Sequence, residues 1–221
     1  YTILLSECKC EAYAYGHQCC DFSDGTLVCL TPGESISMKE NNKEFPSKGW
    51  ILAFHPDLIC GTPLGLNIHN YTFFSYCPEE ALHLSLREKQ IILEFLERIR
   101  QELERCIDRH SKKIISKYIE LLLDYCTRFY ERQFITRSEV NKKVFREFNH
   151  LLDNHFNVKV SLSTDVLSDE YCANLLHLSP AYFNDLLKYE IGKEFKEYIQ
   201  FKRFEIAKGW LVNTDKTLGQ I

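Results

Sequence analysis

One short stretch of the chain carries side chains that can read the edges of DNA bases. Its members share one face of a predicted helix, at spacings of three and four residues: Ala181, Asn184, Asp185 and Lys188. In a major groove an Asn side chain pairs with adenine, an Asp accepts a hydrogen bond from cytosine, and a small side chain meets the thymine methyl group. The stretch therefore predicts contacts to double-stranded DNA.

Two helices that meet at a tight turn would position this face. Ser179 is a favoured N-cap residue, and Pro180 suits the first helical position because its missing N–H needs no partner there. The preceding apolar run ends only at His177 and Leu178, which leaves no room for a loop. We therefore expect a helix-turn-helix, with the free N–H groups near Ser179 facing a phosphate and Tyr182 on the flank of the exposed face.

The opposite side of this second helix is apolar. We expect that side to pack on the preceding helix, through Phe183, Leu186, Leu187 and Ile191. Many all-helical domains contain such a pair without binding nucleic acid, so a plain helical interaction module is an alternative. The stretch from Asp169 to Lys208 has six Lys or Arg against seven Asp or Glu and lacks the basic patch typical of DNA-binding domains. DNA affinity would depend on a few placed residues.

Composition limits the class of protein. The chain has 221 residues, 45% of them hydrophobic, and a net charge of −4, which favours a folded protein of two domains over a disordered one. We find no apolar run of roughly 20 residues and no signal peptide, so we predict a cytoplasmic protein without membrane contact. Because it begins at Tyr1 without an initiator methionine and stops at Ile221 inside a helical pattern, we expect a fragment of a longer protein.

Ten cysteines raise the question of metal or redox chemistry. Five of them fall within the first thirty residues: Cys8, Cys10, Cys19, Cys20 and Cys29. Their spacing does not match a zinc-finger CxxC pair, and cysteine packs readily as a small buried hydrophobic residue. We predict reduced thiols and no metal, cofactor or catalytic centre. A metal or redox sensor, or an enzyme using His17 and these cysteines, is the alternative.

The remaining elements follow from hydrophobic periodicity. Residues 1–76 are predicted as strands, among them YTILL, EAYAY, GTLVCL and GWILAFH, in an antiparallel sheet or small barrel. Ser85 and Glu88 form a capping box ahead of a long helix whose apolar stripe extends to Ile107. A second long helix follows Ser111, so the two should form an antiparallel hairpin. Their apolar faces are wide, which favours a homodimer through the hairpin.

From Ser138 onward the pattern changes to shorter helices. We predict a linker over 157–167, then the helix-turn-helix, which Gly192 ends as a natural C′ residue. A further helix begins near Phe195. Another is just starting at Thr217.

The segment 171–211, YCANLLHLSPAYFNDLLKYEIGKEFKEYIQFKRFEIAKGWL, resembles the first helix-turn-helix and linker helix of AraC/XylS-family transcription regulators. DGTLVCLTPGES, GWILAFHPDLICGTPLG and YTFFSY are similar to the cupin-type effector domain of one branch of that family. The resemblance implies that three residues read bases and three contact the DNA backbone: Ala181, Asn184 and Asp185, then Ser179, Tyr182 and Lys188. It also implies a second helix-turn-helix, of which only Thr217–Ile221 are present. His17 lacks the second histidine of the metal-binding cupins.

We therefore predict an α+β protein in three parts: a cupin-like β-barrel over 1–83, a dimerising helical hairpin over 84–136, and an all-α DNA-binding domain over 137–221. The predicted function is transcription regulation of AraC type, either constitutive or in response to a small-molecule effector in the barrel. With one complete helix-turn-helix, the chain should bind DNA weakly.

Overall fold

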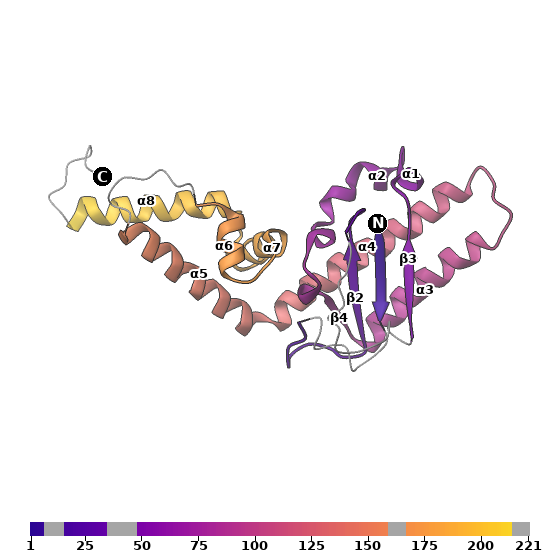
Figure 1. The fold of residues 1–221 in the computed structure, drawn as a ribbon, viewed down its shortest axis with the longest axis horizontal. Helices are drawn as coiled ribbons and strands as arrows, with labels where there is room; N and C mark the ends of the chain where they lie inside the picture. Colours follow the sequence, from indigo (N-terminus) through magenta and orange to yellow (C-terminus); the bar gives the residue numbers. More distant parts are fainter. Residues whose placement is uncertain (7–15, 35–47, 159–166, 214–221) are drawn as a thin grey trace.

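The computed structural model describes residues 1–6, 16–34, 48–158 and 167–213. The fold is α+β, as predicted, with a sheet and a long helical hairpin at one end and four helices at the other (Figure 1). Within the described residues, no helix is both long enough and apolar enough to cross a membrane.

The sheet contains four antiparallel strands in the order β3-β1-β2-β4. They are β1 (Thr2–Ser6), β2 (Gly25–Leu30), β3 (Gly49–Ala53) and β4 (Leu82–Leu84). Ile3 and Leu5 are buried on one face of β1 and enter the core, as alternation along a strand requires. β3 and β4 are the edges, so the described strands form an open sheet; the predicted strand EAYAY lies outside the described residues.

Short helices occupy most of residues 56–80, which corrects the prediction that strands extend through residue 76. This segment contains the short helices α1 (Pro56–Ile59), α2 (Pro63–Asn67), η2 (Ile68–Asn70), η3 (Thr72–Ser75) and η4 (Pro78–Glu80). His55 and Thr62 accept hydrogen bonds from backbone N–H groups at the starts of α1 and α2, and a proline follows each cap. A cap followed by proline is a helix start signal, and here it outweighs the β propensity of the aromatic residues.

The hairpin consists of α3 (Leu86–Leu103) and α4 (Ser111–Thr136), which lie side by side against the sheet (Figure 1). The predicted capping box is present: the Ser85 hydroxyl accepts from the Glu88 N–H at 3.3 Å, and the Glu88 carboxylate accepts from the Ser85 N–H at 2.9 Å. The apolar stripe predicted for this helix is too long, because Ile107 lies beyond the end of α3 and is 84% exposed. Buried side chains of the sheet, the short helices and the hairpin form one core together with Tyr182 and Leu186, called here the N-terminal core.

Four helices follow: α5 (Ser138–Val158), α6 (Asp169–Leu175), α7 (Pro180–Ile191) and α8 (Phe195–Asn213). Helix α5 extends to Val158, so the first residues of the segment predicted as a linker, 157–167, are helical. A second core joins these helices and is called here the C-terminal core; it contains Phe148, Leu152, Leu167, Cys172, Ala173, Phe183, Leu187, Phe195, Tyr198 and Ile199. Within this group α7 lies on the side toward the sheet (Figure 1).

Candidate nucleic-acid interface

The turn between α6 and α7 has the tight geometry predicted from the sequence. The Ser168 hydroxyl caps α6 by accepting from the Tyr171 N–H at 3.1 Å. After α6, His177 adopts a left-handed conformation with φ 57°, and the Leu178 N–H donates back to the Ala173 carbonyl at 2.9 Å. A left-handed residue that closes such a bond satisfies carbonyls at the end of a helix and turns the chain sharply. Because of this turn, the N-cap of α7 follows the end of α6 within a few residues.

Helix α7 begins and ends as predicted. The Ser179 hydroxyl accepts from the Tyr182 N–H at 3.2 Å, and Pro180 occupies the first helical position. Gly192 ends the helix in the left-handed region with φ 66°, and its N–H donates to the Lys188 carbonyl at 3.0 Å. The cap, the proline and the glycine therefore act locally to define a helix of twelve residues.

The apolar residues of α7 divide between two cores. Phe183 and Leu187 belong to the C-terminal core, where the Phe183 ring meets Phe148 edge to face with centroids 5.0 Å apart. Leu186 is buried in the N-terminal core instead. The prediction that all four apolar residues pack on the preceding helix is therefore wrong for Leu186, because part of the neighbouring domain covers that side of α7.

The predicted DNA-facing side of α7 packs against the N-terminal part of the protein. Tyr182 is 4% exposed, and its ring lies 5.2 Å from Phe134 and 5.1 Å from Tyr76, measured between centroids. Ala181 also packs against the N-terminal core. In this conformation Ala181 and Tyr182 therefore contact the N-terminal part rather than water.

Polar contacts join the same surfaces. The Tyr76 hydroxyl donates to the Asp185 carboxylate at 2.6 Å. Glu80, at the end of η4, accepts from the Ser179 N–H at 2.6 Å and also from the Ser179 hydroxyl. Glu80 and Ser179 are each 4% exposed. Burial raises the pKa of Glu80 above its usual range, although the hydrogen bonds from Ser179 act in the opposite direction.

Asn184 and Lys188, the two remaining predicted DNA contacts, differ in their exposure and bonding. The Asn184 side-chain amide donates to the Asp169 carboxylate of α6 at 3.0 Å, so it is tied within the helix-turn-helix. Lys188 is exposed. Among the six predicted DNA-binding residues it alone is exposed, Ser179 and Tyr182 are buried, and the other three are half-buried.

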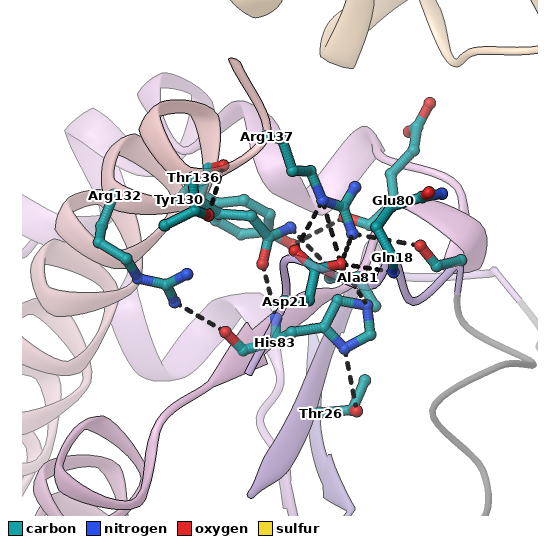
Figure 2. Close-up of polar contacts among 12 residues, drawn as sticks. Gln18, Asp21, Thr26, Glu80, Ala81, His83, Tyr130, Arg132, Thr136 and Arg137 are labelled. Atoms are coloured by element: carbon teal, nitrogen blue, oxygen red, sulfur yellow. Dashed lines mark hydrogen bonds and ion pairs between the residues drawn. The ribbon is translucent and has the colours of Figure 1, made fainter. Parts of the chain in front are cut away.

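A buried ion pair lies where α4 meets α5. Arg137, the C-cap of α4, donates to the Asp21 carboxylate from Nη2 at 2.6 Å and from Nε at 2.9 Å. Figure 2 shows Asp21 between Arg137 and the His83 ring, whose Nε2 is 4.0 Å away. Burial acts to raise the pKa of Asp21, but the bonds from Arg137 outweigh it and hold the pKa below 3.8. Burial raises the pKa of the Tyr182 hydroxyl, and the Arg137 guanidinium acts to lower it against this larger effect, so the ion pair acts on α7 electrostatically.

A comparison with known proteins finds a helix-turn-helix regulator that is similar to part of the chain. Over 83 residues, 38% of the chain, the protein is 29% identical to an uncharacterized HTH-type transcriptional regulator, YtdP, of Bacillus subtilis strain 168. The matched stretch is 11% of that protein's length, so the chain spans a small part of it. No protein-family model matches the chain, and no solved structure matches it significantly. The similarity supports a helix-turn-helix transcription regulator in general.

The alternative metal or redox site finds little support in the described residues. His17 packs edge to face on His83, with centroids 5.0 Å apart. Burial raises the pKa of the Cys29 thiol well above its usual value, and burial and the Asp21 carboxylate raise that of Cys20, which disfavours the reactive thiolate. Cys8 and Cys10 lie outside the described residues. In the part of the chain that the structure describes, no three His, Cys, Asp or Glu residues are placed to hold a metal ion.

Four residues important to this interface escaped prediction: Tyr76, Glu80, Asp21 and Arg137. Glu80 and Ser179 are 99 positions apart in the sequence, and Asp21 and Arg137 are 116 apart. No periodicity or local motif connects residues at such separations. The one local signal is the adjacent pair of acidic residues that ends η4, and such a pair is usually a solvated surface feature.

Proposed function

We propose that this protein is an AraC-type transcription regulator that binds duplex DNA through α7, in the cytoplasm. The observation that carries the proposal is the α6-turn-α7 unit, in which Ser179 and Pro180 start the second helix and a separate apolar core supports it. In a helix-turn-helix the N-terminal half of the second helix reads bases in the major groove. Ala181, Asn184 and Asp185 occupy that half, and Lys188 would contact a phosphate. The protein acts through binding and has no catalytic role.

The proposal includes a cupin-type barrel with a small-molecule effector inside it. Its support is the resemblance of three N-terminal segments to the cupin-type domain and the antiparallel pairing of all four described strands. Mass spectrometry of the purified chain after denaturation tests this part. A stoichiometric organic molecule would support it, and a chain that remains empty while regulating a promoter would contradict it.

Selection from a pool of randomised duplexes tests DNA recognition. We expect weak binding by the native chain, because one helix-turn-helix offers at most two good base pairings of about 1–3 kcal/mol each. Asn184→Ala should relax the selected sequence preference. Lys188→Ala should weaken binding to all sequences alike and reduce its dependence on salt, since a phosphate contact carries no sequence information.

Matched variants separate recognition from general effects. Asn174→Ala removes an exposed amide from α6 by the same substitution, and Lys48→Ala removes the same charge near β3. Neither should change the sequences selected. If no duplex is enriched by the native chain or by any variant, the DNA-binding proposal is wrong.

We also propose a homodimer through the hairpin. Helix α4 exposes Ile114 and Leu121, which are one heptad apart on one face, with the half-buried Tyr118 between them. Burying this stripe against a second copy would remove it from water. Light scattering should give a dimer mass for the native chain and a monomer mass for the double variant Ile114→Glu and Leu121→Glu. An unchanged mass in the variant would exclude this surface.

A further inference from the structure

The N-terminal part of the protein covers the start of α7. We propose that this contact is autoinhibitory: Glu80 and Tyr76 hold the recognition helix in a closed conformation that excludes DNA, and regulation acts by opening it. This inference rests on the proposed function, because a covered helix is inhibited only if its covered side has a ligand.

Glu80 lies against the N-cap residue of α7, at the end of the helix where we expect a DNA phosphate. The N–H groups at the start of a helix form an anion site, and phosphates bind there in helix-turn-helix complexes. In this structure both Glu80 oxygens are engaged: one accepts from the Ser179 N–H, and the other accepts from the Ser179 hydroxyl and the Cys77 N–H. A buried carboxylate therefore stands in for the phosphate, and its charge would repel an approaching DNA backbone.

The base-reading side is covered as well. Asp185 accepts a hydrogen bond from Tyr76 in η3, and Tyr182 is enclosed by Tyr76 and by Phe134 of α4. A major groove about 12 Å wide admits one helix. It has no room for α7 together with η3 and α4. DNA binding therefore requires that these elements separate from α7.

Opening would leave α7 itself intact. Its cap is internal, from the Ser179 hydroxyl to the Tyr182 N–H, and Phe183 and Leu187 remain in the C-terminal core. Between Thr136, the last residue of α4, and Ser138, the first of α5, only Arg137 intervenes, so a change of backbone angles at this junction could move the C-terminal helices as a body. The free energy of opening then depends on the contact between the parts, and this is a property that a regulator can change.

The amide of Ser179 reports the closed state without any DNA. In the closed conformation its N–H donates to Glu80, and in an open one it would face water. Nitrogen-15 NMR exchange measurements on the native chain should show a protected Ser179 amide. Glu80→Gln removes the charge and one acceptor site, so we expect exchange at Ser179 to become about tenfold faster or more. Tyr76→Phe removes the hydroxyl bonded to Asp185 and should act in the same direction.

Each variant has a matched control in the same segment. Glu79→Gln removes the same charge from the adjacent exposed residue. Tyr71→Phe removes a hydroxyl that donates to Asp124 of α4 rather than to α7. Both controls should leave Ser179 exchange unchanged. Thermal unfolding of each variant by circular dichroism shows which ones remain folded, and Tyr76→Phe provides the test if Glu80→Gln does not fold.

A DNA measurement on the same proteins completes the test. With randomised duplex at low salt, the double variant Tyr76→Phe and Glu80→Gln should bind about tenfold tighter than the native chain. Unchanged Ser179 exchange in both single variants would overturn the inference. Native binding as tight as that of the double variant would also overturn it, while leaving the proposed function in place. If exchange accelerates but no protein binds DNA, the contact is real but the proposed function is wrong, and autoinhibition falls with it.

Discussion

The two sides of α7 pack against different parts of the molecule and by different means. On one side Phe183 and Leu187 enter an apolar core of helices that are close in sequence. On the other, Tyr182 and Leu186 enter a core built mainly from the sheet and the hairpin, and the polar pairs Tyr76–Asp185 and Glu80–Ser179 accompany them. The first contact holds the helix-turn-helix together. The second joins it to a distant part of the chain.

Because of this difference, one contact of α7 stabilises the helix-turn-helix fold and the other can open for regulation. The C-terminal core is lost only when α5 to α8 unfold, because its stability comes from removing apolar surface from water. The contact with the N-terminal part also buries Leu186 and Tyr182, but its hydrogen bonds and charges exchange their partners for water or phosphate at small net cost, so opening it costs less than unfolding the helices. The C-terminal core can therefore remain folded while the contact with the N-terminal part opens. Substitutions on the two sides of α7 should have separable effects.

The largest effect is expected at the buried ion pair behind Tyr182. Asp21→Asn leaves the Arg137 guanidinium buried without its carboxylate, and breaking a buried pair in this way costs about 3–5 kcal/mol. Denaturant unfolding of the N-terminal part, followed by amide exchange in α4, measures the loss. The exposed pair Glu139–Lys142 is the control, because surface pairs contribute little, and Glu139→Gln should leave stability unchanged.

The same pair makes stability depend on pH. Because the pKa of Asp21 is lower in the folded protein than its ordinary value of 3.8, its contribution is present above that value and is lost as the pH falls through the lowered pKa. Native stability should therefore decline as the pH falls below about 5, and the Asp21→Asn variant should show a shallower decline. Equal slopes for the two proteins would contradict the role assigned to this pair.

The next effect belongs to the C-terminal core. Leu187 is completely buried there, and Leu187→Ala should lower the free energy of unfolding of α5 to α8 by about 2–5 kcal/mol, through lost burial and the cavity left behind. Native-state amide exchange in α6 and α7 measures this loss. Exchange in α3 should change little. Equal acceleration in both regions would show that the two cores unfold as one unit.

Sequence patterns predicted local features well and long-range contacts poorly. Ser179, Pro180 and Gly192 define α7 through bonds within a few residues, and Ser85 with Glu88 starts α3 in the same way, so these elements were predictable. The helical segment after His55 carried similar signals at Pro56 and Thr62–Pro63, but the aromatic residues there favoured a strand interpretation. The covering of α7 was not predictable, because Glu80 and Tyr76 reach it only through the tertiary fold. Leu186 shows the limit most clearly, since helical spacing places it with Leu187 on one face while the structure assigns the two to different cores.

The smallest effect on folding is expected at Leu186. This residue also gives the sharpest test of whether the two sides of α7 are separable. Leu186→Ala removes the same atoms as Leu187→Ala from the adjacent residue, but it removes them from the N-terminal core. Burying a leucine side chain contributes about 1.5–3 kcal/mol, and here that amount stabilises the contact between the two parts. Since 1.4 kcal/mol is about a factor of ten, the open form should become at least about tenfold more populated. Exchange at the Ser179 amide should accelerate accordingly, while α6 keeps its native protection. Loss of α6 protection in Leu186→Ala would instead mean that the covered side of α7 is part of its folding core, and the two sides would not be separable.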